Sequence, residues 1–235
     1  MESTINDAPQ ISIDREKTLR GHRRYWVLRR AQDIVFSLLA LILLAPLALL
    51  ISLAIVLDSP GDGAIFRQRR VGRDGKLFWL YKFRTMCPDA EKRLNELLKL
   101  NQMDGPVFKI KGDPRITRVG RFLRKTSLDE LPQLWNILVG DMAVIGPRPA
   151  LWNQYDLLAE RDKYGANDVR PGLTGWAQIH GRDELEIAEK AKLDGWYVEH
   201  ISFGLDVKCF FGTITAVLKH DGVVEGGTGT LHDEK

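Results

Sequence analysis

The stretch TSLDELP at 126–132 places two adjacent carboxylates, Asp129 and Glu130, at the expected start of a helix over 129–139. Ser127 and Glu130 have the spacing of a capping box, and Pro132 is tolerated only in a first helical turn. The dipole and free N–H groups of such a helix start favour ionised carboxylates. An ionised aspartate here could hold Mg²⁺ or attack phosphorus, although two ordinary capping acids would have the same sequence.

Basic residues accompany this carboxylate pair. Arg121, Arg124 and Lys125 lie just upstream, and a helix start beside arginine and lysine is a suitable cradle for phosphate. Lys82 and Arg84, in the stretch YKFRTM, stand at alternate positions and would share one face of a strand. A solvated basic edge strand has the same spacing, so this pattern alone does not separate substrate binding from surface charge.

Arg148 stands between two prolines in GPRP at 146–149. The rings restrict the backbone and lower the entropic cost of presenting a guanidinium to a diphosphate, although a proline-rich turn with a surface arginine fits equally. The sequence contains no P-loop, no HExxH motif and no GxSxG motif, and its five histidines are scattered. What remains is carboxylate, arginine and lysine chemistry.

An apolar segment precedes all of these residues. Residues 34–57 carry no charge over 24 positions, more than the ~20 that cross a bilayer core as a helix. The run is too long, and begins too far into the chain, for a cleaved signal peptide. Five basic residues flank each side, which gives no orientation bias and predicts two cytoplasmic ends. They are Arg20, Arg23, Arg24, Arg29 and Arg30 before the run, and Arg67, Arg69, Arg70, Arg73 and Lys76 after it.

Pro46 lies in the middle of this apolar run. A proline there removes one helical hydrogen bond and bends the axis, so two half-helices could enter and leave the membrane on one side. Together with the symmetric flanks, this favours a re-entrant helix broken at Pro46 over a helix that spans the bilayer.

Charge is distributed unevenly over the 235 residues, whose formal net charge is +3. Residues 58–128 hold 17 basic and 8 acidic groups, whereas residues 129–235 hold 10 and 18. A basic stretch beside a membrane segment indicates anionic headgroups or phosphorylated substrates, although a solvated surface is also compatible. A hydrophobic content of 44% excludes wholesale disorder, and two cysteines 122 positions apart exclude a disulfide framework.

The remaining elements predict a mostly α fold of the α+β class with one short β-hairpin. AIFRQRRVG and KLFWLYKFRTM alternate around Arg73-Asp74-Gly75, which predicts the hairpin. Further helices are expected over 89–102, 116–124, 150–164 and 203–219, and the last could pack in the core or lie on a membrane surface. The expected units are a polar tail (1–18), a basic flank with the re-entrant helix (19–60), a cytosolic domain with amphipathic interfacial helices (61–222) and a disordered tail (223–235).

These stretches together resemble the bacterial sugar transferase family, the monotopic polyprenyl-phosphate phosphoglycosyl transferases, in its small catalytic-unit form. The matching text is the apolar run with Pro46, then FRQRRVGRDGKLFWLYKFRTM, GDPRITRVGRFLRKTSLDELPQLWNILVGDMAVIGPRPAL and VRPGLTGWAQIHGR. Ala45 stands where some relatives have a serine, whose hydroxyl could satisfy a freed carbonyl at the break.

The resemblance implies transfer of a sugar 1-phosphate from a nucleotide diphosphate sugar, usually a UDP-sugar, to polyprenyl (undecaprenyl) phosphate. This would be the first membrane step of a polysaccharide or glycoconjugate pathway. It also implies a location in the bacterial inner membrane, with bound membrane lipid and a catalytic domain that faces the cytoplasm.

The resemblance also implies roles for single residues. Asp129 would attack the β-phosphorus, expel UMP and become a phosphosugar-aspartate that the lipid phosphate then attacks, with Glu130 assisting. Mg²⁺, held by Asp129 and Glu130, would neutralise the diphosphate. The expected substrate-binding residues are Arg84, from its place on the strand, and Lys82, Arg124 and Arg148, which match basic residues of the family.

Two other functions fit part of the pattern. A membrane-anchored glycosyl transferase would move the sugar without its phosphate and release UDP. A membrane-tethered basic adaptor would bind anionic lipid and would not need Asp129. Nucleic acid is not an expected partner, because the basic segment is poor in aromatic residues and the C-terminal half is acidic. The sequence leaves open the sugar, the nucleotide base, the glycan pathway and association into a homo-oligomer.

Overall fold

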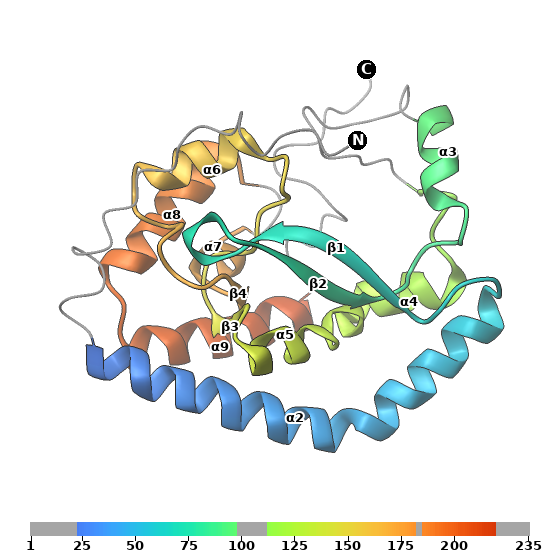
Figure 1. Ribbon diagram of the computed structural model, residues 1–235, viewed down its shortest axis with the longest axis horizontal. Helices are drawn as coiled ribbons and strands as arrows, with labels where there is room; N and C mark the ends of the chain where they lie inside the picture. The colour runs from blue at the N-terminus through green and yellow to red at the C-terminus, as the bar shows by residue number, and fades with distance from the viewer. Residues whose placement is uncertain (1–22, 98–111, 182–184, 220–235) are drawn as a thin grey trace.

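One long helix runs along one side of the computed structural model, which describes residues 23–97, 112–181 and 185–219 (Figure 1). This helix, α2 (Arg23–Asp58), continues without interruption through Pro46 and curves around the rest of the fold. The expected break into two half-helices at Pro46 is therefore not confirmed. A proline can bend a helix while the turns on both sides of it persist.

Most of the apolar surface of α2 is uncovered. In its most apolar 18-residue window the mean hydropathy is 3.0, yet only 11% of the window is buried. Leu43 and Leu49 are 78% and 72% exposed. A core helix of a soluble protein would be mostly buried, so the exposure and the length together favour a helix that enters a membrane.

Polar side chains fix the N-terminal turns of α2 to the C-terminal part of the chain. Tyr25 and Tyr197 both donate hydrogen bonds to Asp206, and the Tyr197 bond is 2.7 Å long. Arg29 lies 3.9 Å from the same carboxylate and also donates to the carbonyl of Ile145. Because all of these side chains are buried, the network holds the start of α2 in one orientation.

The expected hairpin is confirmed. Strands β1 (Ile65–Val71) and β2 (Leu77–Phe83) are antiparallel, with Ile65 opposite Phe83 and Val71 opposite Leu77. The 3-10 turn η2 (Arg73–Gly75) joins them, and Asp74 and Gly75 have positive φ angles of 62° and 71°. Asp and Gly tolerate this conformation better than other residues, which explains the turn.

Of the seven helices that follow α2 in the described residues, those over 176–179 and 187–199 were not predicted, and the other five follow the predicted order with shifted ends. The seven are α3 (Ala90–Leu97), α4 (Arg118–Thr126), α5 (Gln133–Val139), α6 (Tyr155–Asp162), α7 (Trp176–Ile179), α8 (Ile187–Glu199) and α9 (Phe203–Lys219). Two short strands that the sequence did not reveal, β3 (Ala143–Ile145) and β4 (Gly172–Thr174), form a parallel pair. The rest of the helix expected over 89–102, and the tails expected at 1–18 and 223–235, lie outside the described residues.

Two buried clusters join the hairpin to α2. Leu80 of β2 packs with Leu134 and Ile137 of α5, against the middle of α2. Phe83, at the end of β2, packs with Leu123 of α4 and with the C-terminal half of α2. The end of β2 and the connection between α4 and α5 are thereby held together beside the apolar helix.

The two faces of α9 have different surroundings. Cys209 is buried and belongs to a core cluster, whereas Phe203, Val207, Phe211 and Ile214 are 41–62% exposed at helical spacing. The helix therefore packs in the core on one side and presents an apolar stripe on the other.

Candidate active site

The two adjacent carboxylates lie in a 3-10 turn, η4 (Leu128–Glu130), between α4 and α5. Ser127 ends α4 in a left-handed conformation (φ 56°), and its N–H bonds back to the carbonyl of Arg124 at 3.2 Å. Its side chain makes no capping bond, so the expected capping box with Glu130 is wrong. The helix expected over 129–139 begins only at Gln133, because the reversal at Ser127 is followed by a separate turn.

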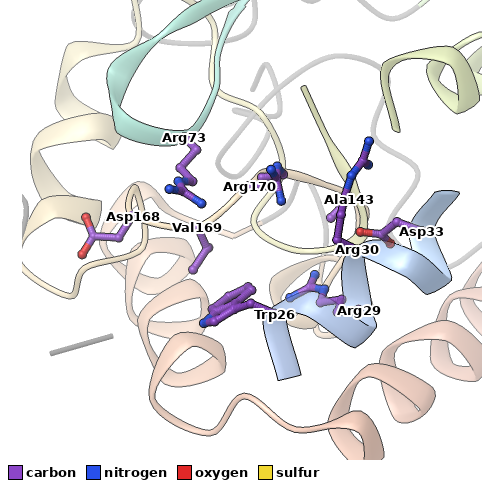
Figure 2. Close-up of a pocket in the computed structure, with 9 residues that line it drawn as sticks. All are labelled: Trp26, Arg29, Arg30, Asp33, Arg73, Ala143, Asp168, Val169 and Arg170. Carbon is purple, nitrogen blue, oxygen red and sulfur yellow. The ribbon is translucent and has the colours of Figure 1, made fainter. Parts of the chain in front are cut away.

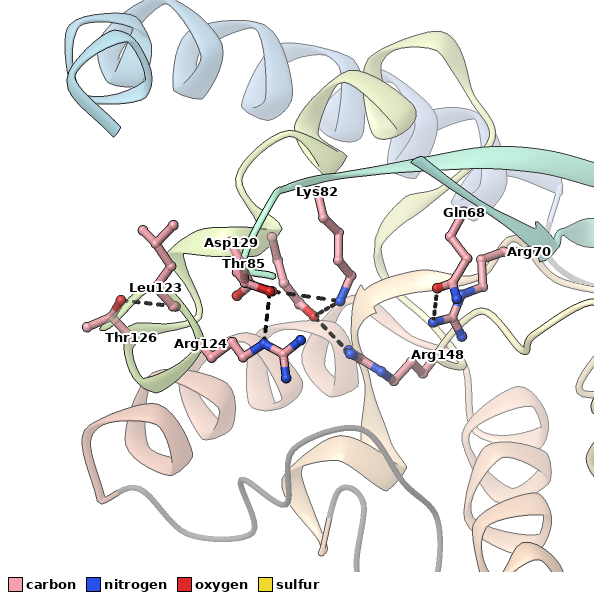
Figure 3. A network of polar contacts seen from close by, with 10 residues as sticks. Gln68, Arg70, Lys82, Thr85, Leu123, Arg124, Thr126, Asp129 and Arg148 are labelled. Carbon is pink, nitrogen blue, oxygen red and sulfur yellow. Dashed lines mark hydrogen bonds and ion pairs between the residues drawn. The ribbon is translucent and has the colours of Figure 1, made fainter. Parts of the chain in front are cut away.

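Glu130 is the anchor of an ion-pair network (Figure 3). Its Oε1 accepts hydrogen bonds from Lys82 Nζ at 3.0 Å and from an Arg148 terminal nitrogen at 2.8 Å. Lys82 Nζ is also 4.0 Å from Oδ2 of Asp129. Lys82 comes from β2 and Arg148 from the loop after β3, so segments distant in sequence meet at η4. These four predicted residues are brought together by the fold.

The two carboxylates experience different electrostatic environments. Burial raises the pKa of Asp129, as does the charge of Glu130, while Lys82 opposes the rise. Burial alone would also raise the pKa of Glu130, but the charges and hydrogen bonds of Arg148 and Lys82 outweigh it and hold that pKa well below its usual range. Glu130 is therefore a permanent anion bound to two cations, whereas Asp129 is a poorly solvated carboxylate beside them.

Arg124 completes the cationic side of the site. Its Nε donates to the hydroxyl of Thr85 at 2.9 Å, and its charge lowers the pKa of Asp129. Figure 3 shows Lys82, Arg124 and Arg148 extending from three different elements toward Asp129. The arrangement can bind the oxygens of a phosphate-bearing molecule and present a carboxylate oxygen to it.

Arg84 is placed elsewhere. Its guanidinium donates to the carbonyls of Ser59 (2.6 Å), Gly63 (2.8 Å) and Asp62 (3.0 Å), the loop by which the chain leaves α2. Strand β2 ends at Phe83, so the alternation that would align Arg84 with Lys82 stops before it. Arg84 therefore binds the carbonyls of the loop after the apolar helix instead of the carboxylate pair.

Sequence reasoning missed a buried ion pair that supports Arg148. Arg161 on α6 donates to the main-chain carbonyl of Arg148 at 2.9 Å and pairs with Asp194 on α8 at 2.6 Å. The Arg161 and Asp194 side chains are only 3% and 1% exposed. No local motif marks them, because their contact joins positions 33 residues apart.

A metal ion would find few protein ligands here. Among the described residues no group of three or more His, Cys, Asp or Glu side chains could hold one. Oxygen donors suit Mg²⁺, which binds through one or two carboxylates together with substrate phosphates and water. Since Oε1 of Glu130 already bonds two cations, Asp129 is the better placed ligand, and the residues fit an ion that arrives with a phosphorylated substrate.

Comparisons with known proteins agree with this chemistry. A family model described as "Bacterial sugar transferase" matches residues 24–220. The undecaprenyl-phosphate galactose phosphotransferase of Salmonella typhimurium is 41% identical over 199 residues, 83% of this chain and 41% of that protein. The UDP-glucose:undecaprenyl-phosphate glucose-1-phosphate transferase of Escherichia coli is 43% identical over 219 residues, 89% and 44% of the two chains.

A shorter relative is matched over most of its length. The exopolysaccharide production protein ExoY of Sinorhizobium fredii is 39% identical over 193 residues, 80% of this chain and 84% of that protein. The present chain spans less than half the length of the Salmonella and Escherichia proteins.

Proposed function

Because this chain belongs to the bacterial sugar transferase family, we propose that it transfers a sugar 1-phosphate from a nucleotide diphosphate sugar to a polyprenyl phosphate. A UDP-sugar is the expected donor and undecaprenyl phosphate the expected acceptor, since both are named in the relative from Escherichia coli. The observation that carries the proposal is that the two carboxylates at η4 have different surroundings. Glu130 binds Lys82 and Arg148, and Asp129 lies buried beside them.

The proposed reaction has two displacements at one phosphorus. An Asp129 oxygen attacks the β-phosphorus of the donor, and the bond from that phosphorus to the bridging oxygen breaks, so that UMP leaves with the electron pair. An oxygen of the polyprenyl phosphate then attacks the same phosphorus, and Asp129 leaves as a carboxylate. The product is a polyprenyl diphosphate sugar, and the kinetics are ping-pong.

The surrounding residues bind and orient the diphosphate. Lys82 and Arg148 are held by Glu130 at 3.0 and 2.8 Å, so their remaining N–H groups are fixed before the donor arrives. Arg124, held by Thr85, adds a third positive charge. Lys82 and Arg148 make their short contacts with Glu130, and Lys82 lies farther, at 4.0 Å, from Oδ2 of Asp129, so we infer that the nucleophile keeps an oxygen available for attack.

Mg²⁺ is part of the proposal. When bound, the ion supplies neutralisation of the diphosphate charge. Asp129 is the residue that would hold it, with Glu130 as a second carboxylate, and the remaining ligands would be phosphate oxygens and water. Requirement for Mg²⁺ is tested by chelation and readdition in the nucleotide-release assay below.

The proposal extends to the membrane. We infer that α2 enters and leaves the cytoplasmic leaflet and that the exposed stripe of α9 lies on the same surface. Support comes from the 11% burial of the apolar window, the bend of α2 and the equal basic flanks on its two sides. A catalytic domain so placed would meet a lipid acceptor at the bilayer surface and a soluble donor in the cytosol.

Cysteine labelling tests this topology. Arg24→Cys and Asp62→Cys, both at exposed positions, would be made separately in a Cys87→Ser chain, with Cys209 left in the core. A membrane-impermeant maleimide should label both in inverted vesicles and neither in spheroplasts. Labelling of one position from the outside would show that α2 spans the bilayer.

Nucleotide release tests the reaction. The purified full chain in nanodiscs would be given a panel of UDP-sugars with Mg²⁺, with and without undecaprenyl phosphate. We expect lipid-dependent UMP that is lost in Asp129→Asn and kept in Asp156→Asn, a matched change at an exposed position on α6. UDP in place of UMP would establish ordinary glycosyl transfer, and absence of turnover with every donor would favour the adaptor function.

A further inference from the structure

A second basic site lies away from the carboxylate pair, where the hairpin turn meets the start of α2 (Figure 2). Arg73 of η2 and Arg170, two residues before β4, lie on one side of a small pocket, and Trp26 and Arg29 of α2 lie on the other. The length of β2, roughly 20 Å at strand spacing, separates this turn from Lys82. The pocket is therefore distinct from the proposed catalytic centre.

One buried hydrogen-bond donor of the residues that line this pocket has no acceptor among the described residues, and two arginine side chains lie beside it. The indole Nε1 of Trp26 is buried and has no hydrogen-bond partner in the described part of the chain. Among the same residues, Arg170 makes one hydrogen bond, from Nε to the carbonyl of Gly140 at 2.9 Å. The Nε of Arg73 lies 3.4 Å from Asp74, and the end of its side chain is part of the pocket wall. A buried donor without an acceptor is costly, so an oxygen-bearing ligand would be stabilised here.

Arginines outnumber acidic residues in the lining, and two of them also lie near carboxylates outside it, Arg29 near Asp206 and Arg73 near Asp74. Four arginines line the pocket with two aspartates, Asp33 and Asp168, and Asp33 already accepts the amide of Val144 at 3.0 Å. Arg30 bonds only main-chain carbonyls, those of Ile137 and Leu138, within the described residues. Burial, followed by repulsion from Arg30 and Arg73, lowers the pKa of Arg170, which an anion would relieve.

The size and the place of the pocket limit the ligand. The cavity volume is about 10 Å³, which is room for about one water-sized atom. It therefore admits a phosphoryl oxygen but not a sugar or a base. Arg30 precedes the apolar run 34–57 by four residues, or ~6 Å of helix. Val27 and Leu28, on the same turns of α2, are 64% and 57% exposed. The pocket thus lies at the level expected for lipid headgroups.

We propose that this pocket receives one oxygen of a phosphate group at the membrane surface, with Arg73, Arg170 and the Trp26 indole N–H as the donors around it. An anionic phospholipid headgroup is the source that this position favours, and free phosphate is the other. The bound anion would join the start of α2 to the hairpin turn and so fix the catalytic domain against the bilayer. The proposal rests on the proposed entry of α2 into the membrane but not on the catalytic assignment, because it concerns binding alone.

Calorimetric titration of the full chain in neutral detergent tests the proposal, with dihexanoyl phosphatidylglycerol as one probe and sodium phosphate as the other. Trp26→Phe removes the N–H and keeps the ring, and Arg73→Gln removes a charge from a surface turn. Each should weaken phosphatidylglycerol binding roughly tenfold, as expected for one lost hydrogen bond to a charged group. Lys76→Gln, the same change at an exposed position outside the pocket, should bind as the unaltered chain does.

The two probes distinguish the source of the phosphate. Tighter binding of phosphatidylglycerol than of phosphate, with both variants weakened, supports a headgroup site. Equal binding of both probes with the same dependence on the variants supports a soluble anion in the same pocket. The proposal is overturned if Trp26→Phe and Arg73→Gln bind as Lys76→Gln does, or if Arg73→Gln raises the KM for the nucleotide sugar and leaves lipid binding unchanged.

Discussion

Replacing Glu130 by glutamine should change the chemistry of its neighbour. The substitution keeps the side-chain shape but removes the charge that holds Lys82 at 3.0 Å and Arg148 at 2.8 Å. Lys82, already 4.0 Å from Asp129, would then have that residue as its nearest carboxylate. The loss of a neighbouring negative charge and the closer approach of Lys82 both lower the pKa of Asp129.

The size of this effect can be worked from the distances. At an effective dielectric constant of about 20, closing the Lys82–Asp129 gap from 4.0 Å to about 3 Å adds about 1.4 kcal/mol of attraction. This is about a tenfold change in the protonation equilibrium of Asp129. Both side chains are less than one-fifth exposed, so solvent screening removes little of it. An ion-paired Asp129 is also a weaker nucleophile, and the phosphate-binding cations lose their anchor, so kcat should fall by roughly 10²–10³.

The assay is the pH dependence of UMP release under saturating donor and lipid. In the unaltered chain the acid limb of kcat should report Asp129 and lie above the ordinary range of an aspartate, because burial raises its pKa. Glu130→Gln should move this limb to lower pH while lowering the plateau. Glu189→Gln, at an exposed position in the first turn of α8, should change neither. An acid limb that stays in place in Glu130→Gln would refute the electrostatic coupling of the two carboxylates.

Three further outcomes follow from the described contacts. Folding lowers the pKa of Glu130 from 4.5, so this carboxylate stabilises the fold fully above pH 4.5 and progressively less as the pH falls below it. Glu130→Gln should therefore flatten the acid side of a Tm-against-pH curve between about pH 5 and 3. Gly120→Ala should cost about 1–3 kcal/mol of unfolding free energy by chemical denaturation, because its Cβ would lie 2.0 Å from the carbonyl oxygen of Thr85. Asp194→Asn should cost about 3–5 kcal/mol by the same measurement, and should raise the KM for the nucleotide sugar more than it lowers kcat, because Arg161 then holds the Arg148 carbonyl less firmly.

Matched variants separate these effects from general damage. Gly204→Ala, a glycine with nothing within 4 Å of an added Cβ, should leave stability unchanged or raise it slightly, in contrast to Gly120→Ala. Asp156→Asn should leave the KM and the Tm unchanged, in contrast to Asp194→Asn. A Tm curve for Glu130→Gln that falls in acid as steeply as that of the unaltered chain would contradict the lowered pKa of Glu130. Asp129 contributes with the opposite sign because its pKa is raised, and Glu130→Gln lowers that pKa, so the variant loses the Glu130 contribution and part of the opposing Asp129 contribution.

Local signals predicted much of the fold. The hairpin could be predicted because alternation and the Asp74-Gly75 turn are properties of adjacent residues. The apolar face of residues 203–219 likewise predicted the helix α9, but it left open whether that face packs in the core or lies on a membrane surface. The parallel pairing of β3 with β4 was not predictable in this way, because two three-residue strands whose paired residues are 29 positions apart carry no periodicity that marks them as partners.

The site was predicted in part, and the failures have a common cause. Asp129, Glu130, Lys82 and Arg148 were expected from residue type and were found together. Arg84 was expected beside Lys82 and instead binds the carbonyls of the loop after α2. Alternation along a strand determines which way a side chain points only as far as the strand extends. The sequence does not mark the residue at which the pairing of β1 with β2 ends. The contacts that decide each role join segments that are distant in the chain.

The two carboxylates show why residue type alone could not separate the proposed nucleophile from its neighbour. Consecutive residues in a 3-10 turn point about 120° apart, so neighbours in the chain enter different surroundings. Glu130 points to two cations that keep it ionised, and Asp129 points to a buried position with weaker compensation. The two carboxyl groups are chemically similar, and their pKa values differ because their side chains point into different surroundings. A longer or more regular helix at this place would separate successive side chains by about 100°. It would not allow the chain reversal at Ser127, which places η4 beside Lys82 and Arg148.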